Sequence, residues 1–140
     1  MKTIVGAKVV LFREDGKTLM LRRSKSAPYR PGELDTAGGI VDEGEDFIEA
    51  AQREVQEEAN LQVKATDIKL VFAESGLRND TPTTWLFFVA KVKDTGVQVS
   101  PEHESFEWMT LNEALEQMED DRHKRLLQYI QQHDLMDLAA

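Results

Sequence analysis

The chain has 140 residues, a formal net charge of −9 and no cysteine. This length favours one domain over residues 1–140 with a substantial core, and the lack of cysteine excludes disulfides and thiolate metal sites. The negative charge argues against binding to a nucleic-acid backbone, which requires clustered Lys and Arg, but a small anionic substrate stays open because a divalent cation and a few basic residues can offset the local field.

The N-terminal segment reads MKTIVGAKVVLF and is apolar, but it is short, contains Lys8 and lacks the cleavage motif of a signal peptide. We therefore expect it to form a strand. No other apolar run approaches the roughly 20 residues that a membrane-spanning helix requires. A cytoplasmic protein without membrane contact is the resulting expectation.

The first third of the chain predicts two strands and an extended segment. Residues 3–13 are rich in Val and Ile, and residues 18–22 follow a turn at 14–17, so the two runs are expected to form a hairpin. Residues 24–34 contain two prolines and a glycine, which indicates a loop. Residues 35–41 are expected to be extended and to lead into a glycine turn.

A helix is predicted from residue 45 or 46 to residue 59. Its apolar residues recur every three or four positions, which is typical of a helix with one buried face. Its glutamates lie largely off that face, so we expect them to be held in place without being buried. The apolar residues are Ile48, Ala51, Val55 and Ala59, and the glutamates are Glu54, Glu57 and Glu58.

The second half of the chain mixes strands and helices without regular alternation, which favours an α/β fold with a mixed sheet between helices. Thr110 and Glu113 form a capping-box pattern at the start of a helix. The last helix is expected to bury Leu126, Leu127 and Ile130. The predicted strands are 68–73, 84–92 and 105–109, the loops are 75–82 and 100–104, and the helices are 110–118 and 121–133.

The most informative pattern runs from Gly39 to Leu61 and reads G-x5-E-x7-R-E-U-x-E-E-x-N-U, where U is a bulky aliphatic residue. Glu54, Glu57 and Glu58 are spaced i, i+3 and i+4, so their like charges repel on one helix face. Glu57 and Glu58 also lie near the C-terminal end of the helix, where the macrodipole favours cations. A solvated acidic face is the alternative, but the fixed offsets of the whole pattern argue against it, and unfavourable local choices often mark functional sites.

Three carboxylates on one helix face suit Mg²⁺ or Mn²⁺, and Mg²⁺ commonly connects protein carboxylates to substrate phosphates. Such a metal can activate a water molecule and polarise a phosphoryl oxygen. The residues therefore predict a divalent metal cofactor and hydrolysis within a diphosphate linkage.

This stretch resembles the Nudix box, the signature of the Nudix hydrolase family. The resemblance implies a single Nudix hydrolase domain over residues 1–140 and an α/β/α sandwich with a mixed β-sheet. The sequence departs from the family pattern at Asn60, where the family has Gly. Asn is the next best residue for the left-handed conformation that often follows a helix, so Asn60 is expected to cap this one.

The resemblance also implies a ligand set. Glu54, Glu57 and Glu58 would bind the metal, and the backbone carbonyl of Gly38 would be a further ligand. One of the glutamates could also accept a proton from the attacking water. Which of them acts as the general base stays open.

Two further residues of the box, Arg53 and Glu45, are expected to orient the glutamates and to connect the loop to the helix. For Arg53 the alternative is an ordinary helix ion pair with Glu49 or Glu57. If the first interpretation holds, Arg53 supports catalysis by positioning the acidic groups.

A second acidic spot lies at Glu102 and Glu104, in the loop before the strand 105–109. Related hydrolases often place a glutamate here as a ligand or general base, and both residues fit that role. A solvated acidic loop is the alternative. His103 is expected to be a loop histidine, because hard metals prefer oxygen ligands.

Basic residues before the box, Arg22, Arg23 and Arg30, could bind phosphates. Side chains alternate along a strand, so only one of Arg22 and Arg23 can face the cleft. Four aromatic residues could either stack on a base or pack in the core: Tyr29, Phe72, Trp85 and Trp108.

The motifs that distinguish several Nudix subfamilies are absent from the sequence. The remaining expectation is hydrolysis of a nucleoside diphosphate derivative, chiefly a (deoxy)nucleoside triphosphate or related nucleotide in a house-cleaning role. A nucleotide-sugar or ADP-ribose type pyrophosphatase and a non-catalytic nucleotide-binding module are the alternatives. The isomerases that share the fold use a catalytic cysteine, which this chain lacks. A small nucleotide is the expected partner, and a homodimer is expected from the frequency of dimers in the family.

Overall fold

The computed structural model describes residues 2–136, which form seven strands and three α-helices around a single mixed sheet. None of the helices in these residues is long and apolar enough to cross a membrane. The strands are β1 Ile4–Phe12, β2 Thr18–Arg23, β3 Leu34–Asp35, β4 Ala37–Ile40, β5 Lys69–Arg78, β6 Thr81–Lys91 and β7 His103–Met109. The helices are α1 Phe47–Ala59, α2 Leu111–Gln117, α3 Asp121–Gln132 and the short 3-10 helix η1 Ala65–Asp67.

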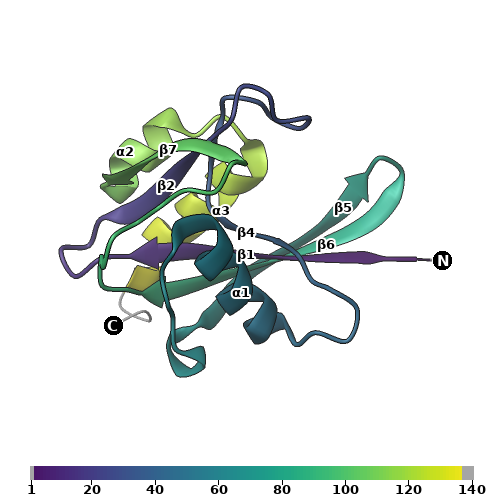
Figure 1. The fold of residues 1–140 in the computed structure, drawn as a ribbon, viewed down its shortest axis with the longest axis horizontal. Helices are drawn as coiled ribbons and strands as arrows, with labels where there is room; N and C mark the ends of the chain where they lie inside the picture. Colours follow the sequence, from purple (N-terminus) through teal and green to yellow (C-terminus); the bar gives the residue numbers. More distant parts are fainter. Residues whose placement is uncertain (1, 137–140) are drawn as a thin grey trace.

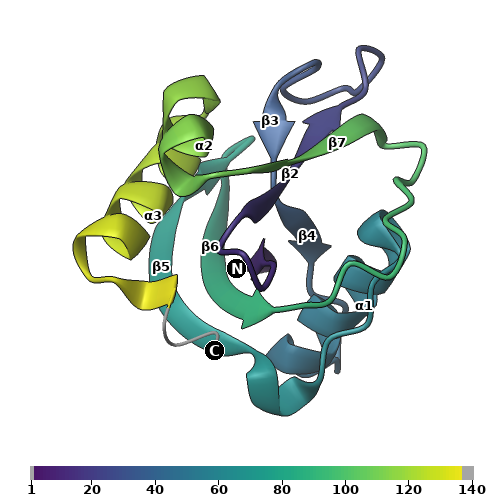
Figure 2. The ribbon, with the colours of Figure 1, turned by 90° about the vertical axis from the view of Figure 1, so that its left-hand side faces the viewer.

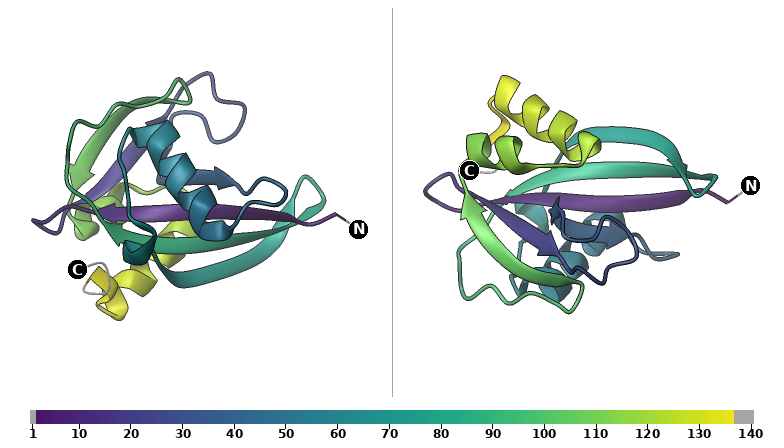
Figure 3. Two further views of the ribbon diagram at one scale, coloured as in Figure 1. Left: turned by 60° about the horizontal axis from the view of Figure 1, so that its bottom comes forward. Right: turned by 90° about the horizontal axis from the view of Figure 1, so that it is seen from above.

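The sheet lies between α1 on one side and the pair α2 and α3 on the other (Figures 1 and 2). Alternation along β1 explains these two layers, because successive side chains point to opposite faces. Val9 and Leu11 pack with the buried face of α1, whereas Val10 and Phe12 pack with α2 and α3. The two views of Figure 3 show the helices on their respective sides. The predicted α/β fold with a mixed sheet between helices is therefore confirmed.

The central strand β1 has three neighbouring strands: β6 on one side, and β4 and β2 on the other, where β4 and β2 pair with different parts of β1. It pairs with β6 in parallel along its whole length and with β4 antiparallel over residues 6–9. It pairs with β2 only where Phe12 faces Thr18, so the predicted hairpin forms at its turn and the two strands then diverge. The first half of β1 therefore pairs with β4, which the loop 41–46 connects to α1 (Figure 1).

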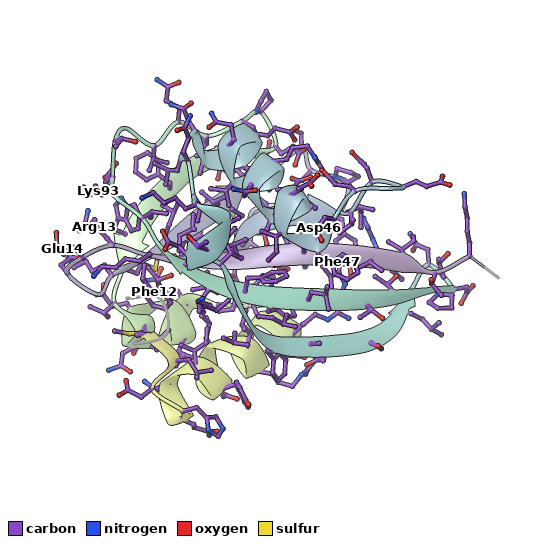
Figure 4. The ribbon with its side chains drawn as sticks, turned by 90° about the horizontal axis from the view of Figure 1, so that it is seen from below. Phe12, Arg13, Glu14, Asp46, Phe47 and Lys93 are labelled. Carbon is purple, nitrogen blue, oxygen red and sulfur yellow. The ribbon has the colours of Figure 1, made fainter. Side chains whose placement is uncertain are left out.

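Both ends of α1 are capped, and the sequence had predicted the cap at Asn60. The Asp46 side chain accepts a hydrogen bond from the Ile48 amide at 3.2 Å, and Figure 4 shows Asp46 and Phe47 at this end of the helix. Asn60 ends the helix in the left-handed conformation, with φ 58° and ψ 35°, and its amide donates to the Gln56 carbonyl. The predicted cap at Asn60 is thus confirmed.

The predicted polar loop over 75–82 is wrong. β5 continues to Arg78, and a two-residue turn at Asn79 and Asp80, both with positive φ, leads into β6. Such a turn matches the twist of a hairpin, and Asn and Asp tolerate positive φ. The polar residues misled the prediction because much of β5 is exposed, and Ser75 pairs across the strands with Thr84 through their hydroxyls.

The boundary predicted before the last strand is also wrong, because β7 begins at His103 and includes Glu104. The helices in this half agree with prediction: α2 has the capping box of Thr110 and Glu113. The residues of α3 expected in the core, Leu126, Leu127 and Ile130, are fully buried.

The cap at Asn60 allows a direct stability test. Replacing Asn60 with Ala should lower the free energy of unfolding by about 1 kcal/mol, because a β-carbon without a local polar partner is disfavoured in the left-handed region. Replacing it with Gly should leave stability unchanged or raise it. Urea denaturation measures both, and an Ala variant as stable as the Gly variant would contradict the assignment.

Candidate active site

A cavity of about 300 Å³ opens where β4 and α1 meet β1 and β6, and the first turn of α3 closes its far side. Its lining contains more basic than acidic side chains, although the chain as a whole is strongly negative. Such a cavity suits an anionic ligand. The basic side chains are Lys8, Arg23, Arg30, Arg78 and Arg122, and the acidic ones are Glu54, Glu102 and Asp120.

The floor of this cavity is organised by Asp35, a carboxylate with no exposed surface. Its oxygens accept hydrogen bonds from Lys8 Nζ at 3.0 Å, Arg23 Nη1 at 3.0 Å and Arg30 Nη2 at 3.2 Å. Burial opposes ionisation of Asp35, but Lys8 and the other cations hold its pKa well below the usual range. Asp35 is therefore a charged hub that fixes three cations on different segments of the chain.

Two buried histidines complete the surroundings of Asp35. His103 Nε2 and His123 Nε2 each lie 3.5 Å from one of its oxygens. His123 Nε2 also lies 3.0 Å from the Thr36 hydroxyl, and its Nδ1 lies 2.6 Å from the Asp120 carboxylate. Burial lowers the pKa of His123, which favours the neutral ring. These contacts attach the start of α3 to the cavity floor.

The glycine pair of β4 brings the backbone close to both β1 and α1. Gly38 has φ 141°, and a β-carbon there would lie 2.1 Å from the Ala7 carbonyl oxygen, so only Gly fits. Its amide donates to Glu58 Oε1 at 2.9 Å, and its carbonyl accepts from Lys8 Nζ at 3.3 Å. Gly39 lies against the Glu54 carboxylate, which a β-carbon would approach to 2.9 Å.

The glutamates of α1 occupy three different environments. Glu58 is buried, with 4% of its surface exposed, so the expectation that these acids would lie off the core is wrong for this residue. Burial raises the pKa of Glu58 to about 8, although Lys8 and the Gly38 amide act in the opposite direction. Glu54 is partly buried at the cavity wall, and burial raises its pKa as well. Glu57 is mostly exposed.

Arg53 lies among the acidic residues of the helix and the preceding loop. Its guanidinium donates to Glu45 at 2.8 and 3.0 Å, to Glu54 at 2.9 Å and to Glu57 at 3.2 Å. It also donates to the Ile40 carbonyl at 3.3 Å. The geometry contains both the loop-to-helix connection that the box implies and the ordinary helix pair with Glu57.

The acidic groups suit a hard divalent cation chemically. Within residues 2–136 no three acidic or histidine side chains form a ready-made cage, and both Glu54 and Glu57 accept hydrogen bonds from Arg53. However, Glu54, Glu58 and the Gly38 carbonyl approach the same short stretch of β4 and supply only oxygen ligands, which Mg²⁺ and Mn²⁺ prefer. Burial raises the pKa of the Glu54 and Glu58 carboxyls. A cation bound between them would lower both pKa values again.

The remaining predicted site residues divide between the cavity and the surface. Arg23, Arg30 and Glu102 line the cavity. Arg22 does not: it points away and contacts the Gly32 carbonyl and Glu119. Glu104 is an exposed residue of β7 and does not line the cavity.

Among the aromatic candidates, Tyr29 and Trp85 line the cavity. Phe72 instead packs against Phe87 and Tyr129, and Trp108 lies under the Arg13 guanidinium.

Several lining residues had escaped the sequence analysis. Lys8 carried a usable signal, because a lysine inside an apolar strand needs a buried partner. The others come from segments that look ordinary in the sequence, and only the fold brings them together. They are Lys8, Arg78, Asp120, Arg122 and His123, and the buried Asp35, which does not line the cavity itself, escaped it as well.

Comparisons with known proteins give the family and fold to which the chain is similar. The model of the NUDIX domain matches residues 2–130. An uncharacterised Nudix hydrolase of Yersinia pestis is 49% identical over 54 residues, which cover 38% of this chain and 30% of that protein. The asymmetrical bis(5'-nucleosyl)-tetraphosphatase of Rattus norvegicus is 33% identical over 99 residues, which cover 64% of each. The chain thus spans less than two thirds of these relatives.

A solved structure extends the similarity over nearly the whole chain. The crystal structure of a Caenorhabditis elegans Ap4A hydrolase binary complex superposes with a TM-score of 0.75 and 26% sequence identity. The similarity covers 94% of this chain and 97% of that one.

The hub at Asp35 predicts a large stability effect. Replacing Asp35 with Ala should lower the free energy of unfolding by about 3–5 kcal/mol, because it leaves Lys8 and two arginines without their buried counter-charge. Urea denaturation measures the loss. Asp15→Ala is the control, because Asp15 pairs with Arg13 at an exposed turn and should change stability little. Equal effects of the two substitutions would contradict the role of Asp35.

Proposed function

This chain belongs to the NUDIX domain family, and on that premise we propose that it is a metal-dependent hydrolase of a diphosphate linkage in a nucleoside diphosphate-X substrate. One observation carries the proposal. The carboxylates of Glu54 and Glu58 meet the glycine pair of β4 at one wall of a cavity whose other charged groups are mostly cations. Acidic groups for a metal and basic groups for phosphates are thus side by side.

The metal would be held by Glu54, Glu58 and the Gly38 carbonyl, with Glu57 as a further ligand. When bound, a divalent cation activates a water molecule and offsets the charge that develops on the phosphoryl oxygens. Arg53 keeps Glu54 and Glu57 oriented through its hydrogen bonds to both. Its second connection, to Glu45, fixes the loop on which this part of the wall depends.

The proton of the attacking water needs an acceptor, and Glu102 is the candidate outside α1. It lines the cavity from the segment before β7, whereas Glu104 does not. The Glu102 carbonyl accepts a hydrogen bond from the Ser24 amide at 3.0 Å, which holds this segment against the loop after β2. A positioned carboxylate can take a proton directly or through one water.

The phosphates of the substrate would meet the cations of the floor. Lys8, Arg23 and Arg30 are already oriented by Asp35, so their positions cost little reorganisation on binding. Guanidinium groups bind phosphate oxygens in pairs, and an ammonium adds a compact charge.

The preferred substrate is a (deoxy)nucleoside triphosphate or a related nucleotide. The rat tetraphosphatase and the Ap4A hydrolase from C. elegans are named for substrates with several linked phosphates, which supports this class. A pyrophosphatase of the nucleotide-sugar or ADP-ribose type and a non-catalytic binding module are the alternatives. The cytoplasmic location and the homodimer stay predictions.

A substrate screen tests the hydrolase directly. Nucleoside triphosphates, dinucleoside polyphosphates, nucleotide sugars and ADP-ribose are incubated with the protein and Mg²⁺, and the products are identified by chromatography. We expect turnover of at least one triphosphate or related nucleotide, and we expect chelation of the metal to abolish it. Absence of turnover across the panel with Mg²⁺ and with Mn²⁺ would remove the enzymatic proposal in favour of a binding module.

The acidic face of α1 predicts a separation of activity from stability. Glu57→Gln and Glu58→Gln should each lower kcat at least about tenfold, because each removes a charged metal ligand. The stability of each variant should be unchanged or higher. Glu57→Gln reduces like-charge repulsion on the helix, and Glu58→Gln replaces a buried carboxyl with a neutral amide whose oxygen can still accept from the Gly38 amide.

The matched control is Glu49→Gln, which makes the same charge change at an exposed position of α1 outside the cavity. It should leave kcat unchanged. Steady-state kinetics and urea denaturation measure the two effects, and full activity in both the Glu57 and Glu58 variants would refute the metal assignment.

A further inference from the structure

The cations of the cavity form two groups with different partners. Lys8, Arg23 and Arg30 are bound to Asp35 at the floor. Arg78 and Arg122 also line the cavity but make no contact with that carboxylate. Arg78 is the last residue of β5, and Arg122 lies in the first turn of α3, so the second group comes from two separate elements.

Arg122 shares its counter-charge with another arginine. Its Nε lies 3.5 Å from a Glu74 oxygen, but Glu74 is already bound by Arg125 through two hydrogen bonds of 2.5 and 2.7 Å. Among the described residues, the Arg122 Nε is buried and has no hydrogen-bond partner. Its guanidinium lies 5.8 Å from the centre of the Trp85 ring, which holds it in place by a cation–π contact.

Arg78 is also held by a cation–π contact, in its case with Tyr29. Its guanidinium lies 5.4 Å from the centre of the Tyr29 ring. Within residues 2–136 it forms no ion pair with an acidic side chain. Tyr29 is half exposed and belongs to the loop after β2, so this contact bridges the β5–β6 hairpin and that loop beside the cavity.

Trp85 connects the two groups of cations. Its ring lies directly over Gly6, where a β-carbon would come within 2.1 Å of the ring. Lys8 Nζ lies 5.9 Å from the ring centre, so Lys8 and Arg122 share one aromatic side chain. Because Lys8 also contacts the Gly38 carbonyl at 3.3 Å, positive charge continues from the proposed metal site past Trp85 to Arg122.

Such an arrangement fits a ligand that carries more negative charge than one diphosphate. Guanidinium groups with free donors recognise phosphate oxygens bidentately. Several cations close together repel one another unless an anion lies among them. The floor group surrounds the buried Asp35, whereas the second group has only Glu74, which Arg125 also binds. An uncharged sugar next to the diphosphate would leave that second group uncompensated.

Resting on the proposed function, we propose that Arg78 and Arg122 form a distal anion subsite. It binds the phosphates that extend beyond the linkage cleaved at Glu54 and Glu58. The substrate class is therefore a nucleoside polyphosphate with at least three phosphates, and nucleotide sugars bind less tightly because nothing on them meets the two arginines.

Calorimetric titration of ADP, ATP and ADP-ribose in EDTA tests the subsite, because chelation prevents hydrolysis and the base stays constant. The unmodified protein should bind ATP about tenfold more tightly than ADP-ribose. Arg78→Gln and Arg122→Gln should each weaken ATP binding about tenfold, as expected when a charged hydrogen-bond donor is lost, and should change ADP-ribose binding by less than about twofold.

Arg13→Gln is the matched control. Arg13 also lies over a tryptophan, with its guanidinium 4.9 Å from the Trp108 ring centre, but it is outside the cavity at the far end of β1 (Figure 4). It should bind all three ligands as the unmodified protein does. Arg122 contacts Glu74 and Trp85, so urea denaturation is used to check that each variant stays folded. Arg78 lies at the end of β5 and provides a second, independent variant.

The outcomes separate the subsite from the hydrolase proposal. Equal weakening of ATP and ADP-ribose, no weakening of either, or no binding of ATP at all would overturn the distal subsite. If one of these results is obtained and the protein still hydrolyses a nucleotide with Mg²⁺, the proposed hydrolase function is retained although the subsite is not. Conversely, a selective loss of ATP binding without turnover of any nucleotide would support the subsite and overturn the hydrolase.

Discussion

The buried carboxylate of Asp35 is the interaction on which the rest of the structure depends. A single charge without exposed surface would be very costly, and it is tolerated because Lys8, Arg23 and Arg30 surround it at 3.0–3.2 Å. These partners come from β1, β2 and the loop between β2 and β3, where the sheet opens. The same contacts therefore hold the divergent strands together and present three oriented cations to the cavity.

A second hub of opposite sign lies on the other side of the glycine pair. Arg53 is one cation among Glu45, Glu54 and Glu57, just as Asp35 is one anion among three cations. The glycine pair separates the two networks and contacts both: the Gly38 carbonyl accepts from Lys8, and Gly39 lies against the Glu54 carboxylate. A β-carbon at Gly38 would clash with the Ala7 carbonyl oxygen, and one at Gly39 would press on the Glu54 carboxylate, which explains why two glycines occur here.

Much of the local structure follows from the sequence because it depends on neighbours only a few residues apart. The spacing of the α1 glutamates, the caps at Asp46 and Asn60, and the capping box of α2 all act within one or two turns. The full length of the β5–β6 hairpin was not predicted from the sequence, because an exposed strand with polar residues resembles a loop when its partner strand is unknown. The burial of Glu58 was missed for a similar reason, since it depends on the distant Gly38 amide.

The sequence by itself determined the acidic helix, its C-terminal cap at Asn60 and the glycine turn before it, because periodicity and capping are local properties of the chain. Only the tertiary structure decided which basic residues line the cavity beside that helix, and that Glu102 lines it while Glu104 does not. Lys8 and Asp35 are 27 residues apart, and Thr36 meets His123 across 87 residues. Such contacts depend on strand pairing and on how the helices cover the sheet. The partners of a buried charge therefore cannot be read from its neighbours in the sequence.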